Sequence, residues 1–272
     1  RDAAAHYATV ELNLTSGERG HRATIVRELL CELTGAESAT VVNNNAGATL
    51  LMLTAFAAGR EVIVSRGELI EIGGSFRLPD VMAASGATLR EVGTTNKTHI
   101  ADYENAINER TAALLKVHTS NYRVVGFSAA ATTDELVALG HKHNLPVIDD
   151  IGSGALIDFA EYGLPTEPHA RGSIAAGADV ALFSGDKLLS GPQAGIIVGK
   201  RAWIDRIERH PMMRALRVDK MTLAGLEATL RLHRDPQTAA REIPVLAMAT
   251  APLDALIARA QRLAAKLGDG FD

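Results

Sequence analysis

Short runs of β-branched and aliphatic residues alternate with longer segments of helical periodicity along most of the chain. The runs predicted as strands cover residues 39–42, 61–65, 88–92, 113–118, 146–149, 180–183 and 196–198. The segments predicted as helices cover residues 47–58, 79–84, 100–108, 133–143, 201–209 and 221–233. Strands that alternate with helices of this length indicate parallel pairing through right-handed crossovers. The strands are continuously apolar, as in a sheet covered by helices on both faces, so the pattern predicts an α/β fold.

The pattern changes near Arg234-Asp235-Pro236, where we place a domain boundary. Residues 1–235 form the predicted large domain. Beyond it, residues 243–248 are predicted as a strand and residues 252–267 as a helix. Because one strand and one helix cannot bury a core of their own, we interpret residues 236–272 as the beginning of a smaller, truncated second domain.

The amino-acid composition excludes several classes of protein. The chain of 272 residues is 47% hydrophobic and 22% charged, which is typical of globular proteins. Its formal net charge of −4 is not the basic balance of a free-standing nucleic-acid binder. The single cysteine, Cys31, excludes an internal disulfide and a multi-cysteine zinc site, and it favours a reducing, cytoplasmic location. The most apolar stretch, residues 46–58, is about half the length of a membrane-spanning helix.

Three turns after predicted strands carry polar or charged residues, and ligands of parallel sheets bind beyond the carboxyl ends of the strands. The turn Asn43 to Ala46 leads into a helix, so it is either a phosphate-binding N-terminus or a plain asparagine cap. Asp149 and Asp150 end a strand, and they are either a capping pair at the surface or the partners of a cation. Lys187 follows Ser184 in a glycine-rich turn, and it is either an exposed lysine or one positioned for Schiff-base chemistry.

The order of the three turns indicates one cofactor. Pyridoxal 5'-phosphate needs a phosphate cradle, a carboxylate beside its pyridine nitrogen and a lysine that binds its aldehyde carbon, and the chain carries these features in that order. The sequence contains none of the motifs that mark a P-loop, a dinucleotide-binding loop or a serine-hydrolase elbow. His141 and His143 lie two apart on a predicted helix, so they face different directions and predict no metal site.

Several motifs resemble the family of bacterial selenocysteine synthases, the L-seryl-tRNA(Sec) selenium transferases. The resemblance rests on Asn43 to Ala46, Arg66 to Glu68, Asp149 to Gly154, Ser184 to Gly195 and Arg214 to Arg217, and it runs nearly end to end. It implies an aspartate-aminotransferase-like, fold-type I enzyme. Members of the family are longer at both ends, so we expect the chain to lack an N-terminal tRNA-binding domain and part of the C-terminal domain.

The resemblance implies a reaction on a charged tRNA. Pyridoxal phosphate held by Lys187 would pass to the seryl amine of seryl-tRNA(Sec) as an aldimine. Loss of the α-proton and the β-hydroxyl would leave a dehydroalanyl intermediate, to which selenophosphate would supply selenium. Lys187 is the implied general base, and Asp186 is implied to assist proton transfer. The implied assembly is a homo-oligomer, a ring of dimers with active sites shared between subunits.

The resemblance also implies which residues touch the ligands. The residues that it assigns to the cofactor are Asn44, Asn45, Ala46, His118, Asn121, Asp150, Ser184 and Lys187. The asparagine turn would bind the phosphate with help from Ser184, and Asp150 would face the pyridine nitrogen, with Asp149 as the alternative. His118 would lie near the ring, and Asn121 would reach its hydroxyl.

The selenium donor is assigned to two arginines. Arg214 and Arg217 are three apart on one side of a predicted helical turn, and the resemblance implies that they present two guanidinium forks to selenophosphate. Without the resemblance they would be read as a solvated helix face.

Two rival functions start from the same residues. A related enzyme would keep the pyridoxal phosphate site and act on a small amino acid as a lyase or a desulfurase-type enzyme. A non-catalytic assembly or tRNA-scaffold protein of the same fold would not need Lys187. The arginine pair and Asp186 favour the tRNA enzyme through the resemblance, and the presence of Lys187, Asp150 and Asn45 argues against a scaffold.

Overall fold

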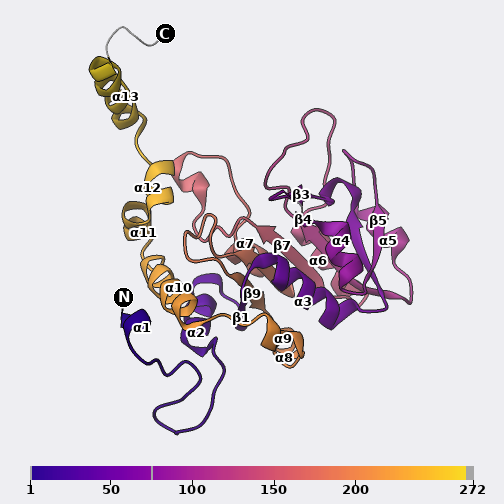
Figure 1. Ribbon diagram of the computed structural model, residues 1–272. Coiled ribbons are helices and arrows are strands. Elements are labelled where there is room, and N and C mark those ends of the chain that lie inside the picture. The colour runs from indigo at the N-terminus through magenta and orange to yellow at the C-terminus, as the bar shows by residue number, and fades with distance from the viewer. Residues whose placement is uncertain (1, 75, 268–272) are drawn as a thin grey trace.

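The computed structural model describes residues 2–74 and 76–267. Within them, a seven-stranded sheet forms the centre of the molecule (Figure 1). Its strands are β1 (Ser38–Val42), β2 (Glu61–Ser65), β5 (Thr88–Val92), β6 (Thr111–Val117), β7 (Val147–Gly152), β8 (Val180–Ser184) and β9 (Gly195–Gly199). All seven strands predicted within residues 1–235 are confirmed. A separate hairpin pairs β3 (Glu71–Ile72) with β4 (Phe76–Arg77).

The strand order is β1-β9-β8-β7-β6-β2-β5, and the sheet is mainly parallel. The predicted parallel pairing is wrong for β9, which runs antiparallel to both β1 and β8. Residues 185–194 connect β8 to β9 without a helix. A parallel return needs a longer crossover, usually a helix, so this connection reverses the chain direction instead.

Helices cover both faces of the sheet. The helices described are α1 (Asp2–Ala5), α2 (Thr24–Thr34), α3 (Asn45–Ala57), α4 (Leu78–Ala84), α5 (Ile100–Ala106), α6 (Thr133–Lys142), α7 (Ala170–Ala175), α8 (Arg201–Glu208), α9 (Met212–Ala215), α10 (Lys220–Leu232), α11 (Pro236–Glu242), α12 (Pro244–Ala249) and α13 (Leu253–Leu267), with the 3-10 turns η1 (Arg66–Glu68) and η2 (Phe159–Tyr162). Successive residues of a strand pack into the cores on opposite faces of the sheet, because side chains alternate across a strand. Leu115 packs with α3 and α4, whereas Leu114 packs with α5 and α6.

Helix α3 lies against the sheet and places its N-terminus at the edge where the parallel strands end. It begins at Asn45 because the side chain of Asn44 accepts a hydrogen bond from the backbone N–H of Gly47 at 2.7 Å. Leu51, Met52 and many of its other residues are buried, so α3 is a core helix rather than an amphipathic surface helix. The position of its first turn is therefore fixed by packing.

A second prediction is wrong in the C-terminal segment. Residues 243–248, predicted as a strand, lie mostly in helix α12, which Pro244 opens at a position where the missing N–H costs nothing. Ile243 and Leu246, three apart, are both buried in one cluster with Phe159, which is a helical spacing. A short apolar run cannot by itself distinguish a strand from a helix.

Helix α13 confirms the predicted helix over residues 252–267, and Figure 1 shows it extending away from the sheet. None of its residues is buried. The predicted boundary after residue 235 stays a prediction, and residues 268–272 of the predicted second domain lie outside the described residues.

The contact between α3 and β9 yields a stability prediction. A Cβ atom added to Gly195 would lie 2.1 Å from the backbone oxygen of Asn44. We expect Gly195→Ala to lower the free energy of unfolding by roughly 1–3 kcal/mol, because the clash is with backbone that cannot move aside.

The matched control is Gly225→Ala in α10, where the nearest atom would be Pro192 Cγ at an ordinary 3.4 Å. Chemical denaturation of both variants provides the comparison. Equal stabilities would contradict the tight packing of the asparagine turn.

Candidate functional site

Three turns meet at one edge of the sheet, where β7 and β8 end and α3 begins. The side chain of Asn45 reaches Asp150 at the end of β7, and the backbone N–H of Leu188 donates to the carbonyl of Ser153 at 2.9 Å. The asparagine turn, the aspartate pair and the lysine turn are therefore brought together, as the rule for ligand sites in parallel sheets predicts.

Asp150 is the most constrained of these side chains. It is only 4% exposed, and its two carboxylate oxygens accept hydrogen bonds from Asn45 Nδ2 and Thr49 Oγ1, each at 2.9 Å. Burial raises the pKa of Asp150 to about 6, although these two hydrogen bonds oppose the rise. Among the ion pairs of the described residues, none involves Asp150. The carboxylate thus lies in a place that favours a cation.

Asp149 points to the opposite face of β7, because neighbouring side chains in a strand alternate. Its Oδ2 accepts hydrogen bonds from Ser173 at 2.7 Å and Thr133 at 3.2 Å, and burial raises its pKa. The alternative of a capping pair at the surface is wrong, since both aspartates are buried. Only Asp150 contacts the asparagine turn.

The lysine turn places a cation beside a carboxylate. Lys187 is exposed, and its Nζ donates to Asp186 Oδ1 at 3.1 Å. The hydroxyl of Ser184 donates to the same oxygen at 2.7 Å. Burial disfavours the ionised form of Asp186, but the hydrogen bonds from Ser184 and Lys187 outweigh it and hold its pKa below the ordinary value. Lys187 Nζ is therefore accessible and held by a carboxylate.

Two predicted cofactor residues have other contacts. The backbone N–H of His118 donates to the carbonyl of Asp150 at 2.9 Å, but its ring lies 3.3 Å from a carboxylate oxygen of Glu167. Asn121 Nδ2 donates to the carbonyl of Glu71 at 3.0 Å. The structure places both residues after β6, near the site, without bringing their side chains to the asparagine turn.

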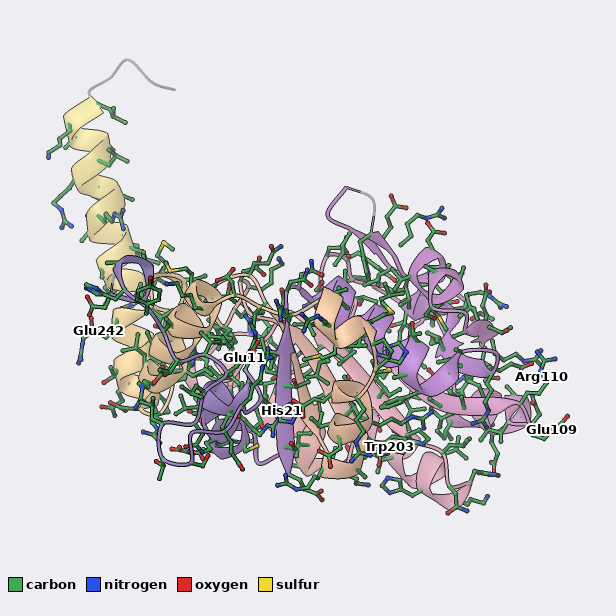
Figure 2. The ribbon with its side chains drawn as sticks, turned by 60° about the horizontal axis from the view of Figure 1, so that its bottom comes forward. Glu11, His21, Glu109, Arg110, Trp203 and Glu242 are labelled. Carbon is green, nitrogen blue, oxygen red and sulfur yellow. The ribbon has the colours of Figure 1, made fainter. Side chains whose placement is uncertain are left out.

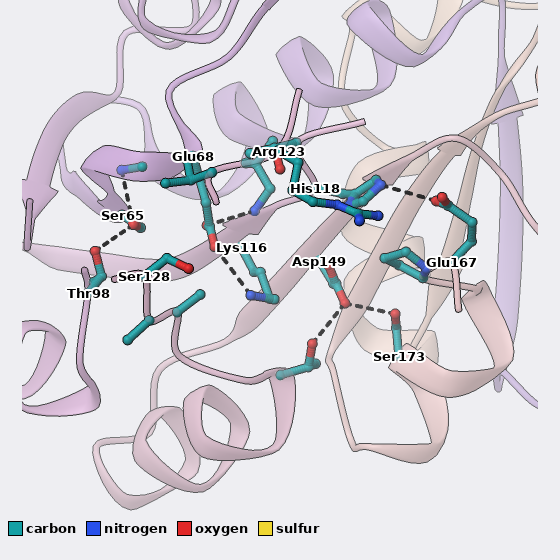
Figure 3. A pocket seen from close by; sticks show the side chains of 18 of the residues that line it. Ser65, Glu68, Thr98, Lys116, His118, Arg123, Ser128, Asp149, Glu167 and Ser173 are labelled. Atoms are coloured by element: carbon teal, nitrogen blue, oxygen red, sulfur yellow. Dashed lines mark hydrogen bonds and ion pairs between the residues drawn. The ribbon is translucent and has the colours of Figure 1, made fainter. Parts of the chain in front are cut away.

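A cavity of about 710 Å³ lies on the opposite face of the sheet edge, where Asp149 points (Figure 3). Two residues that the sequence analysis did not single out pair inside it: Lys116 Nζ lies 3.2 Å from Glu68 Oε1. Glu68 Oε2 also accepts the backbone N–H of Val117 at 3.0 Å, and burial raises the pKa of Glu68. A lysine inside an apolar strand was the available signal for this pair.

The two predicted donor arginines line a second pocket, of about 490 Å³. The prediction that they share one helical turn is wrong. Helix α9 ends at Ala215, and the carbonyl of Leu216 accepts the backbone N–H of Asn43 at 2.9 Å, so the chain turns to pair with β1. Arg214 therefore lies on α9, and Arg217 lies beyond it.

The same pocket contains residues that the sequence analysis missed. Arg19 and Arg22 line it together with Glu11, which lies more than 200 residues away from the predicted pair. The close spacing of two arginines around Gly20 and His21 was their signal in the sequence. Nothing local indicated that they meet Arg214 and Arg217.

Across residues 2–74 and 76–267, no group of three or more His, Cys, Asp and Glu side chains is placed to hold a metal ion. His141 is exposed and lies 3.3 Å from Asp179, and Cys31 is half-buried on α2. No helix among the described residues combines the length and the apolar character needed to cross a membrane.

Comparisons with known proteins give a consistent result. The family model described as SelA, L-seryl-tRNA selenium transferase, matches residues 1–272. A protein of Nitratidesulfovibrio vulgaris named L-seryl-tRNA(Sec) selenium transferase is 63% identical over 97% of this chain and 56% of its own length. One of the same name from Desulfovibrio desulfuricans is 58% identical over 99% of this chain and 57% of its own length. The chain thus spans little more than half of these relatives.

Solved structures confirm the fold class. D-glucosaminate-6-phosphate ammonia-lyase matches with a TM-score of 0.67 and 23% identity, over 85% of this chain and 60% of that protein. Aspartate aminotransferase of Thermus thermophilus matches with a TM-score of 0.61 and 20% identity, over 83% of this chain and 58% of that protein. The chain has the aspartate-aminotransferase-like, fold-type I architecture.

The burial of Asp150 yields a pH prediction for the cofactor-free protein. Its folded pKa of about 6 lies above the ordinary value of 3.8, so the folded state holds this proton longer than the unfolded state. The free energy of unfolding contributed by Asp150 is therefore fully present below pH 3.8 and is lost as pH rises to about 6. We expect Asp150→Asn to gain stability over the wild type by on the order of 3 kcal/mol across this window.

Urea denaturation at a series of pH values measures this difference. Asp134→Asn at an exposed position serves as the control. A stability difference between Asp150→Asn and the wild type that does not change with pH would show that Asp150 is not protonated as described.

Proposed function

Because the chain belongs to the L-seryl-tRNA selenium transferase family, we propose that the full-length protein converts seryl-tRNA(Sec) to selenocysteinyl-tRNA(Sec). Selenophosphate is the proposed selenium donor, and pyridoxal 5'-phosphate is the proposed cofactor. The observation that carries this proposal is the meeting of Asn45, Asp150 and the Lys187 turn at one edge of the sheet.

The asparagine turn suits the phosphate group of the cofactor. The backbone N–H groups of Asn45 and Ala46 make no hydrogen bond within the described part of the chain, and they lie at the N-terminus of a 13-residue helix. Such a terminus attracts anions through its free N–H groups and its dipole. Asn45 Oδ1 is also buried without a partner among the described residues. The hydroxyl of Ser184, predicted to assist, is committed to Asp186.

Asp150 suits the pyridine nitrogen. Its carboxylate is buried and lacks a cationic partner within the described residues, and a protonated ring nitrogen would supply one. Asp150 would thereby keep a proton on that nitrogen. Asp149 points into the cavity on the other face, which makes it the less suitable candidate.

Lys187 suits covalent attachment and proton transfer. When bound, the cofactor withdraws electrons from the α-carbon of an attached amino acid and so makes its α-proton acidic. Lys187 Nζ would be the nucleophile that holds the cofactor, and its free amine would be the base that takes the α-proton. Asp186 orients Nζ through their 3.1 Å contact and stabilises the ammonium form that results.

Arg214 and Arg217 are the proposed residues for the selenium donor. They line one pocket, and the backbone beside them is tied to the asparagine turn through Leu216 and Asn43. Guanidinium groups bind phosphate-like oxyanions through paired hydrogen bonds. A donor bound in this pocket would lie next to the proposed cofactor site.

We further propose a cytoplasmic homo-oligomer whose subunits share active sites. Lys187 remains 58% exposed at its side chain, and the chemistry requires exclusion of water. Additional cover would come from a second subunit or from parts of the full-length protein outside the described residues. The tRNA substrate favours the cytoplasm.

Attachment of the cofactor is testable by spectroscopy. Full-length protein mixed with pyridoxal phosphate should show a visible absorption band, and Lys187→Ala should lack it because the attachment point is gone. Lys200→Ala is the matched control, since its Nζ pairs with Asp179 far from the lysine turn. A visible band that survives in Lys187→Ala would exclude Lys187 as the attachment site.

The donor assignment makes a separate prediction. Replacing both Arg214 and Arg217 by Gln should lower kcat/KM for selenophosphate by roughly 100-fold or more, because two charge-assisted contacts are lost. The visible band should remain. Loss of the band, or turnover of free serine or cysteine in place of seryl-tRNA(Sec), would contradict the assigned roles.

A further inference from the structure

A glutamate from the N-terminal segment occupies the pocket of the proposed donor arginines. Glu11 Oε2 accepts a hydrogen bond from Arg19 Nε at 2.8 Å, and Glu11 Oε1 accepts one from Arg22 Nε. Arg217 Nη1 lies 3.7 Å from Glu11 Oε1. We call Arg19, Arg22, Arg214 and Arg217 the arginine cage. Figure 2 shows Glu11 and His21 beside the outer strand of the sheet.

Positive charge in the cage exceeds the negative charge available to it. Of the two carboxylates that line the pocket, Glu208 is bound to Arg27 outside the cage, which leaves Glu11. Hydrogen bonds from Arg22, which has the larger effect, and from Arg19 hold the pKa of Glu11 below its ordinary value. Within the described residues Arg214 has no ion-pair partner. The cage therefore has capacity for more negative charge than one carboxylate carries.

A second, independent feature also points to an oxyanion ligand in this pocket. Thr40 on β1 lines the same pocket, is 0% exposed, and has a hydroxyl with no hydrogen-bond partner among the described residues. Buried hydroxyls are nearly always hydrogen-bonded. An oxyanion with several oxygens would satisfy this hydroxyl as well as the guanidinium groups.

We propose that Glu11 is a built-in competitor that holds the place of the donor oxyanion, and that Arg19 and Arg22 join Arg214 and Arg217 in binding that oxyanion when Glu11 leaves. The identity of the oxyanion as selenophosphate rests on the proposed function. The same guanidinium forks bind carboxylate and phosphate, but a second anion cannot enter beside Glu11 without repulsion. Binding is therefore an exchange of one anion for another.

The exchange also supplies selectivity. A phosphate-like dianion carries more charge than the single carboxylate of Glu11, so it can displace Glu11, whereas a monoanion such as acetate gains nothing over it. Glu11 lies outside the helices and sheet strands described, shortly before a turn that the backbone hydrogen bond from the Asn13 N–H to the Glu18 carbonyl closes at 2.9 Å. Its displacement does not require the central sheet to move.

The test uses full-length, cofactor-loaded protein and inorganic phosphate as the probe in calorimetric titrations. A site that is free about one tenth of the time binds about tenfold more weakly than a site that is always free. Glu11→Gln leaves the cage free at all times, so it should tighten phosphate binding, by about tenfold for a wild-type cage that Glu11 vacates about one tenth of the time. Glu18, which ends the turn that follows Glu11, has a side chain without a partner within the described residues, so Glu18→Gln should leave phosphate binding unchanged. Unchanged or weaker binding by Glu11→Gln would overturn the proposal.

A second variant tests the cage itself. Arg19 is 71% exposed at its side chain and contacts Glu11, so its replacement leaves the core intact. In the Glu11→Gln background, Arg19→Gln should weaken phosphate binding by about tenfold, as expected for one charged hydrogen-bonding partner. In the wild-type background the loss should be smaller, because the same change also frees Glu11. No loss in the Glu11→Gln background would remove Arg19 from the cage.

These titrations need no turnover, so they separate the two proposals. Tighter phosphate binding by Glu11→Gln without any selenocysteinyl-tRNA(Sec) formation by the wild type would support the cage and contradict the proposed function. Selenium transfer by the wild type with no change in Glu11→Gln would support the proposed function and overturn the competitor role.

Discussion

The buried carboxylate of Asp150 is the interaction on which the site depends. It joins the end of β7 to the first turn of α3 through Asn45 and Thr49, two elements about 100 residues apart in the chain. A buried carboxylate without a cation is costly, and its pKa of about 6 reflects that cost. The fold thus holds a charge whose natural complement is a cationic ligand, in a position set by both the sheet and the helix.

The surrounding architecture keeps this contact in place. Helix α3 is packed into the core, and β9 approaches the asparagine turn so closely that only Gly195 fits there. The segment after α9 then pairs with the outer side of β1 and ties its own carbonyl at Leu216 to Asn43. The same turn therefore connects the proposed cofactor site to the arginine cage, so the two proposed anion-binding sites lie side by side.

The sequence predicts what local periodicity and strand order determine. The alternation of strands and helices is confirmed, and the rule that strand ends meet at one edge correctly joins Asn45 with Asp150. The antiparallel direction of β9 depends on a short connection, and the helix at Pro244 replaces a strand because apolar composition alone is ambiguous. Contacts between distant segments, such as Glu11 with Arg217, have no local signal in the sequence. The sequence left two aspartates as alternatives, and the structure was needed to show which of them faces the asparagine turn.

The most direct test of this account is the ionisation of Asp150 with and without cofactor. Carbon-13 NMR of aspartate carboxyl groups in the full-length protein would follow it, with Asp150→Asn identifying the signal. The account predicts that the signal titrates near pH 6 in the cofactor-free protein and becomes ionised throughout the neutral range once pyridoxal phosphate binds. A titration that the cofactor leaves unchanged would contradict the pairing of Asp150 with the cofactor ring.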